Sequence, residues 1–254
     1  MFPETLPMTP MHNQHHLRLF RRTSTTCAGL ATALLAFFTP ASMIAADESV
    51  DTTLPEGKEN WFVWNPDHDT SGESVLSMAD WIDGPAGNRG RVTRIDGEIF
   101  YGGEPLKIWG LNLCYGACAP NREMADRRAD FYAKYGINAV RLHKYAENAV
   151  LLDGSSTEYD PEALDRMDYF IAALKKRGIF VKLSPTFGSM KIAGDAWERI
   201  PYADEWGTRP SGRKRVGTGS GAVFLSRELQ EMHFEQMTNL LNHKNPYTGL
   251  TYAE

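Results

Sequence analysis

Arg141 and His143 are the two residues whose types and spacing most clearly suggest chemistry. They alternate with Val140 and Leu142 in the apolar stretch 137–143, which has the composition of a buried strand. Because successive side chains of a strand point to opposite faces, Arg141 and His143 share one face and the two aliphatic residues share the other. An inward-pointing arginine needs a carboxylate partner, since burying an unpaired charge is costly. We therefore expect a functional site at the end of this strand, with a structural ion pair as the alternative.

Two neighbouring strands of the same pattern would bring further polar side chains to this end. The strand predicted over 108–113 places Asn112 on the face opposite its leucines, where its amide would reach the mouth of the site. The strand predicted over 179–184 places Lys182 and Ser184 on one face, with Ser184 at the rim. A single serine or lysine is weak support for a site, so structural roles for both stay open.

Three helical segments alternate with these strands. The first spans about 121–135, the second starts at Asp160-Pro161 and is closed by Gly178, and the third starts at Ser226. Each has an apolar stripe at helical spacing. The predicted stripes are Ala125, Ala129 and Tyr132 in the first helix, Leu164, Met167, Ile171 and Leu174 in the second, and Leu229, Phe234, Met237 and Leu241 in the third.

This alternation of strands and helices predicts a parallel α/β sheet. A doubly wound nucleotide-binding sheet would need a Gly-rich phosphate loop after the first strand, but residues 112–117 contain neither G-x-G-x-x-G nor G-K-[ST]. The pattern favours a (β/α)8 TIM barrel over 107–254, which we expect to be truncated after its third βα unit. The roughly forty residues between the third strand and Ser226 exceed usual connections and are predicted to be functional or mobile.

Residues 1–46 have the order of a secretory signal peptide. Arg18, Arg21 and Arg22 precede an uncharged apolar run that ends in small residues. A single membrane anchor is the alternative, and Pro40 within the run favours cleavage. We therefore expect a secreted or periplasmic protein with no stable membrane association after cleavage.

Residues 47–106 form an N-terminal extension with one clear structural signal. The alternating runs 91–95 and 98–101 flank the dipeptide Asp96-Gly97. Asp-Gly between alternating runs is the strongest short signal for a β-hairpin. We therefore predict a β-hairpin ahead of the α/β region.

The charge balance argues against a nucleic-acid partner. The chain contains 27 Lys+Arg and 32 Asp+Glu, which gives a net charge of −5. Removing residues 1–46, which contain Glu4 and three arginines, leaves 24 basic and 31 acidic residues and a net charge of −7. An acidic exported protein has no electrostatic reason to bind nucleic acid.

Metal, cofactor and serine-nucleophile chemistry are not indicated. Cys114 and Cys118 form a C-x3-C pair without clustered histidines, which is a weak metal signal. Two buried thiols and a disulfide both remain possible for this pair. The second strand carries Arg141-Leu142-His143 rather than the His-x-His of barrel metallohydrolases, and the sequence has no G-x-S-x-G. We expect no metal and no cofactor.

Four stretches of the chain, 107–113, 136–143, 164–169 and 245–250, resemble glycoside hydrolase family 5, the cellulase-type retaining barrels. The first two are similar to the strand patterns WG-x-N-x-C and GIN-x-VR-x-H of a secreted bacterial subgroup. The resemblance covers about residues 60–254. It implies hydrolysis of O-glycosyl bonds, with a polysaccharide or oligosaccharide as the binding partner.

The resemblance also implies roles for particular residues. Arg141 matches an arginine that supports the nucleophilic carboxylate, and His143 matches a position near the sugar-binding cleft. The acid/base would be the Glu of an Asn-Glu pair ending strand four, and the nucleophile a Glu ending strand seven. Neither glutamate motif is found in this chain. Glu254 is preceded by Ala253 and not by an asparagine, so it does not form the Asn-Glu pair. Many members place a histidine at the end of strand three, where this chain has Ser184.

We therefore expect the chain to be the N-terminal part of a glycosidase, inactive by itself, with both catalytic glutamates beyond Glu254. A non-catalytic carbohydrate-binding barrel is the alternative, and a secreted structural fragment without a ligand is a third hypothesis. The sugar, the linkage and the oligomeric state stay open. Seven loop carboxylates are predicted to be solvated charges: Glu147, Asp153, Glu158, Asp195, Glu198, Asp204 and Glu205.

Overall fold

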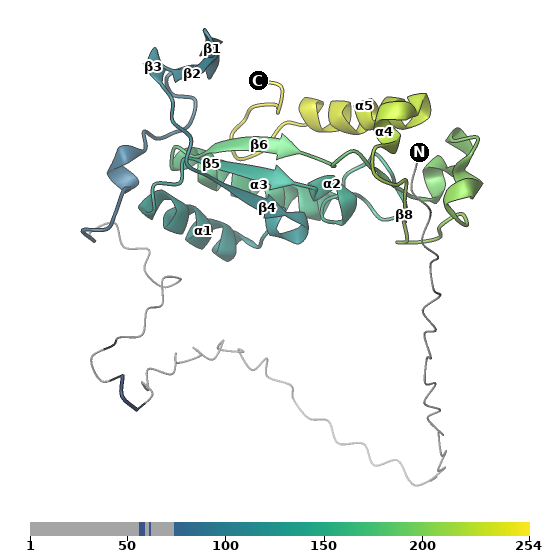
Figure 1. Ribbon diagram of the computed structural model, residues 1–254, viewed down its shortest axis with the longest axis horizontal. Coiled ribbons are helices and arrows are strands. Elements are labelled where there is room, and N and C mark those ends of the chain that lie inside the picture. Colours follow the sequence, from purple (N-terminus) through teal and green to yellow (C-terminus); the bar gives the residue numbers. More distant parts are fainter. Residues whose placement is uncertain (1–55, 59–60, 62–73) are drawn as a thin grey trace, which may run out of the picture. The chain divides into compact units, whose positions relative to one another are not determined.

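The computed structural model describes residues 56–58, 61 and 74–254 (Figure 1). The chain divides into two units, 1–53 and 54–254, and the fold described here belongs to the second. The signal peptide predicted for 1–46 lies outside the described residues. Within the described part, no helix is long and apolar enough to cross a membrane.

A three-stranded parallel sheet forms the centre of the fold. Its strands are β4 (Gly110–Cys114), β5 (Ala139–His143) and β6 (Phe180–Ser184), in the order β4-β5-β6. The predicted parallel α/β sheet is therefore confirmed, with β5 in the middle. Both β4 and β6 are edge strands, so the described residues contain an open sheet and no closed barrel.

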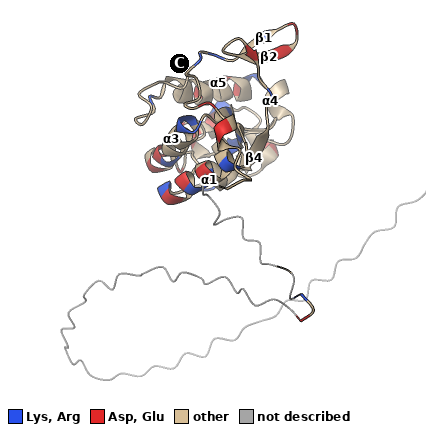
Figure 2. Ribbon diagram, turned by 90° about the vertical axis from the view of Figure 1, so that its left-hand side faces the viewer, with Lys and Arg blue, Asp and Glu red and all other residues tan. Residues whose placement is uncertain are grey.

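Helices α1 (Arg122–Lys134) and α3 (Pro161–Lys176) cover one face of this sheet (Figure 1). The helices begin where capping chemistry predicts, because the side chains of Asn121 and Asp160 each accept a backbone N–H of the first turn. Their apolar sides bury the main core together with the strand residues that point toward them. Figure 2 shows acidic and basic residues interspersed along both helices.

The N-terminal extension contains a small antiparallel sheet of β1 (Thr93–Ile95), β2 (Glu98–Tyr101) and β3 (Glu104–Pro105). The predicted hairpin turn is confirmed, since Asp96 and Gly97 both have positive φ, at 51° and 91°. Strand β3 was not predicted from the sequence. A short 3-10 helix, η2 (Ala79–Trp81), precedes this sheet.

The long segment after β6 was predicted to be a functional or mobile loop. The structure shows that it is packed around a second core, and its function stays a prediction. It contains β7 (Lys191–Ile192), η4 (Gly194–Arg199), η5 (Ala203–Trp206), β8 (Val216–Gly217) and α4 (Ala222–Leu225), followed by α5 (Arg227–Asn242). The elements before α5 are too short to produce a detectable helical or strand period. Its core consists of Met190, Ile192, Ala196, Trp197, Ile200, Ala203, Val223, Leu229 and Met232.

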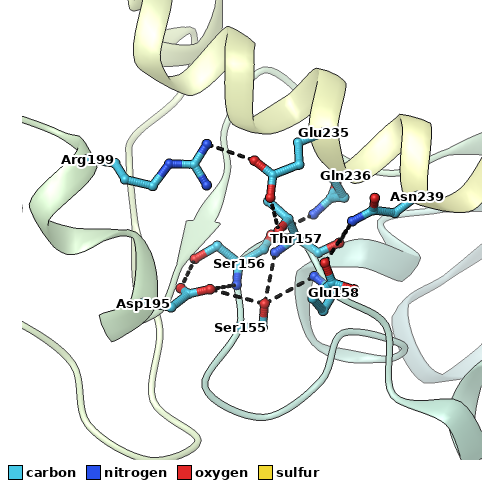
Figure 3. Close-up of polar contacts among 9 residues, drawn as sticks. All are labelled: Ser155, Ser156, Thr157, Glu158, Asp195, Arg199, Glu235, Gln236 and Asn239. Carbon is cyan, nitrogen blue, oxygen red and sulfur yellow. Dashed lines mark hydrogen bonds and ion pairs between the residues drawn. The ribbon is translucent and has the colours of Figure 1, made fainter.

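A polar network connects the loop between β5 and α3 to the segment around this second core and to α5 (Figure 3). Asp195 accepts hydrogen bonds from the Ser155 hydroxyl and from both the backbone N–H and the hydroxyl of Ser156. Glu235 on α5 accepts from Thr157 and Arg199, each at 2.8 Å. Asp195 is exposed, as expected of a solvated loop charge, and its carboxylate in addition joins two segments of the chain.

A buried carboxylate provides the first testable prediction. Asp168 of α3 is 1% exposed and accepts hydrogen bonds from Tyr252 at 2.5 Å and from His243 at 2.7 Å. Replacing Asp168 by alanine leaves these polar groups without their partner, so we expect the free energy of unfolding to fall by about 3 kcal/mol. Denaturant titration of the purified chain measures this change.

Asp165→Ala is the matched control on the same helix. Asp165 is partly exposed and bonds Arg122 and Tyr247 at the surface, so its loss is expected to cost less than about 1 kcal/mol. Equal losses for the two variants would contradict the role assigned to the buried carboxylate.

Candidate functional site

Two rows of side chains cross the sheet on the face opposite the helices. Strand register aligns Asn112, Arg141 and Lys182 in one row. It aligns Cys114, His143 and Ser184 in the next row, at the C-terminal strand ends. The intervening residues belong to the main core or pack against it, including Val140, Val181, Leu113, Leu142 and Leu183. The predicted register of β5, with Arg141 and His143 on the face away from the helices, is confirmed.

Ser184 joins the two predicted site residues of β5. Its hydroxyl lies 3.0 Å from Nη2 of Arg141 and 3.0 Å from Nδ1 of His143. From the sequence alone, this serine had only weak support as a site residue at the rim. The signal was present in the register, because two parallel strands that end together place the last residue of one beside the last residue of the other.

Arg141 has no carboxylate partner among the described residues. Its Nη2 donates to a neutral hydroxyl, and its Nε is buried without a hydrogen-bond partner in the same part of the chain. The alternative of a structural ion pair below the site therefore receives no support from this region. A half-buried guanidinium without a carboxylate partner has spare donors for an anionic or oxygen-rich group.

His143 is 9% exposed and sits at the end of β5. Burial holds the pKa of His143 below its usual range, and the positive charges of Arg141 and Lys144 act in the same direction. The negative charge of Glu147 opposes them. These effects favour the neutral imidazole.

An exposed aromatic surface lies beside the histidine. Phe187 is 69% exposed and meets the His143 ring edge to face, with 5.9 Å between centroids. Phe224 is also exposed and lies close to Gly188, where an added Cβ would come within 3.0 Å of the phenyl ring. Exposed apolar side chains grouped beside polar ones are typical of ligand-binding surfaces.

Asn112 is exposed, and its amide donates to the Cys114 sulfur at 3.1 Å. It shares a row with Arg141 but takes no part in the bonds at Ser184.

Cys114 and Cys118 are both free thiols, so no disulfide joins them. Burial raises the pKa of Cys118 to about 12, which makes it unreactive at neutral pH.

The carboxylates near the strand ends differ from prediction at one position. Glu147, in the short helix α2 (Tyr145–Asn148) that follows β5, is buried and lies 3.4 Å from the ammonium of Lys144. The prediction that Glu147 is a solvated loop charge is wrong, because the turn buries its carboxylate beside the Lys144 ammonium. Glu254 is exposed, and its carboxylate accepts the N–H and hydroxyl of Thr251.

Among the described residues, no group of three or more His, Cys, Asp and Glu side chains could hold a metal ion. The 3-10 helix η3 (Tyr115–Cys118) that follows β4 contributes Tyr115, whose hydroxyl accepts a hydrogen bond from Lys144. The strand-end face thus presents hydrogen-bond donors and aromatic rings.

A scan against protein-family models matched no family, and a search of curated proteins found no similar sequence.

Proposed function

We propose that this chain is the N-terminal part of a secreted or periplasmic retaining glycoside hydrolase, whose complete (β/α)8 barrel resembles family 5 and hydrolyses O-glycosyl bonds of a polysaccharide or oligosaccharide. The observation that carries the proposal is the placement of Arg141 and His143. Both lie at the C-terminal end of β5, on the face away from the helices, where (β/α)8 barrels keep their active sites.

The open face of the sheet supports a larger barrel. Ile108 and Trp109, immediately before β4, are large apolar residues exposed to solvent. Large exposed apolar groups beside an unpaired strand edge favour contact with further structure. Additional βα units continuing from the sheet would cover them and pair the edges.

The unused hydrogen-bond donors of Arg141 support the proposal that a nucleophilic carboxylate lies beside it in the complete barrel. A retaining mechanism uses two carboxyl groups roughly 5 Å apart, one attacking the anomeric carbon and the other acting first as acid and then as base. A guanidinium beside the nucleophile keeps that carboxylate ionised. The spare donors of Arg141 are placed to do this, while His143 and Phe187 would contact the sugar.

A non-catalytic carbohydrate-binding barrel is the second candidate. The observation in its favour is that β4, β5 and β6 end in Cys114, His143 and Ser184, so none of the three strands ends in a carboxylate. This candidate keeps the aromatic and donor groups for binding and needs no nucleophile.

Hydrolysis by the product of the complete reading frame separates the two candidates. We expect it to cleave aryl β-glycosides and soluble glucans, and the sugar first released to retain the β configuration when followed by proton NMR. The chain of 254 residues, as a control, is expected to show no hydrolysis above background. Saccharide binding without hydrolysis by the complete protein would support the binding barrel instead, and inversion would contradict the retaining mechanism.

A further inference from the structure

We infer that Ser184 is a positioning residue that fixes His143 in the tautomer carrying its proton on Nε2, so that His143 presents a hydrogen-bond donor to an oxygen of the ligand. That this ligand is a saccharide rests on the proposed function. The assignment of the tautomer rests only on the contacts of Arg141, His143 and Ser184.

The inference follows from counting protons around the Ser184 hydroxyl. Arg141 has donors and no acceptor, so its Nη2 at 3.0 Å must donate to Oγ of Ser184. The hydroxyl then has one proton of its own to place, and Nδ1 of His143 lies 3.0 Å away. If Nδ1 carried a proton, Oγ would receive two donors and its own proton would have no acceptor among the described residues. Donation from Ser184 to Nδ1 satisfies all three groups.

The surroundings of the ring favour the same neutral form. Arg141 and Lys144 are cations on either side of His143 in the sequence, and both disfavour a second proton on the imidazole. Glu147 acts in the opposite direction but is engaged with Lys144. A neutral ring whose Nδ1 accepts a hydrogen bond carries its single proton on Nε2.

The consequence is a site face rich in donors, to which Asn112 adds an amide oxygen as an acceptor. Nε2–H of His143 can only donate, Arg141 and Lys182 can only donate, and Nε2 has no hydrogen-bond partner among the described residues. Such a face suits the oxygen acceptors of neutral or acidic sugars, and it disfavours the ammonium group of an amino sugar. Phe187 supplies an adjacent apolar surface.

The test is the tautomer of His143 in the intact chain labelled with 15N-histidine. Long-range proton–nitrogen correlation spectra distinguish a protonated from an unprotonated ring nitrogen, and the His143→Gln variant assigns the signal among the seven histidines. We expect Nδ1 to be unprotonated and Nε2 to be protonated. A protonated Nδ1 in the unaltered chain would overturn the inference without any need for a Ser184 variant.

Variants of Ser184 measure the strength of the effect. Ser184→Thr keeps the hydroxyl and is expected to keep the tautomer. Ser184→Ala removes one hydrogen bond and is expected to reduce the ratio of the two tautomers about tenfold. An unchanged ratio in a folded Ser184→Ala variant would contradict the positioning role.

Titration with neutral oligosaccharides and with their amino-sugar counterparts separates this inference from the proposed function. Failure of every saccharide to shift the His143 signals, with Nε2 protonated, would leave the positioning role intact and contradict saccharide binding at this face. Preferential binding of the amino sugars would contradict the donor-rich character inferred for the face.

Discussion

Replacing Arg141 by methionine in the complete protein is expected to lower kcat/KM for an aryl β-glycoside by about 100-fold or more. The guanidinium has no carboxylate partner among the described residues, and it lies at the strand end where the proposed nucleophile would approach. Without it the nucleophile would have a raised pKa, because an opposite charge would no longer favour its ionised form. The acid limb of the pH–rate profile should therefore move to higher pH.

Arg127→Met is the matched control for this experiment. Arg127 is exposed on α1, where it contacts the Met124 sulfur, and its loss is expected to change kcat/KM less than about twofold. An Arg141→Met enzyme with the activity and pH profile of the unaltered protein would remove the role assigned to Arg141.

The second large effect concerns the main core. Phe170 of α3 is 0% exposed and belongs to the cluster that α1 and α3 form with the sheet. Phe170→Ala is expected to lower the free energy of unfolding by about 3–5 kcal/mol, because it removes buried apolar surface and leaves a cavity. Denaturant midpoints of the purified chain, with unchanged slopes, would measure it.

Phe234→Ala provides the same chemical change on α5, where the ring is 67% exposed. Its expected effect is within about 0.5 kcal/mol. Similar losses for both phenylalanines would show that the helix faces are not packed as described.

Strands β4, β5 and β6, the starts of α1, α3 and α5, and the side-chain alternation of β5 were predictable from the sequence because each depends on local signals. The predicted N-cap Asp160 is confirmed, and the predicted helix starts at Asn121 and Ser226 coincide with cap residues that bond the first turn. The alternation in β5 correctly separated Arg141 and His143 from the aliphatic residues. Short-range patterns of this kind do not depend on the rest of the molecule.

The buried faces of two helices were less predictable. In α3, Phe170 is buried while the predicted Ile171 is only partly so. In α5, Leu229 is buried as predicted, but Phe234 and Leu241 are exposed and Met232, Gln236 and Leu240 take the interior. The α5 stripe was wrong because α5 contributes to both cores, so its buried face is set by its partners rather than by its own period.

Local sequence patterns could not predict the hydrogen bonds of Ser184 to Arg141 and His143, nor the second core. Ser184 lies 43 residues beyond Arg141 and 41 beyond His143, and only the pairing of β5 with β6 brings them together. The second core is assembled from 3-10 turns and two-residue strands, which leave no periodic signal. The hydrogen bonds by which the exposed Asp195 joins two segments likewise give no signal in the sequence.

The measurement that tests the central claim most directly is the nucleotide sequence of the reading frame at and beyond codon 254. The proposed glycosidase predicts continued coding sequence with further βα units, an Asn-Glu pair at the end of the next strand and a second strand-end glutamate near the seventh. An authentic stop codon directly after Glu254, or a continuation without these glutamates, would contradict the glycosidase assignment.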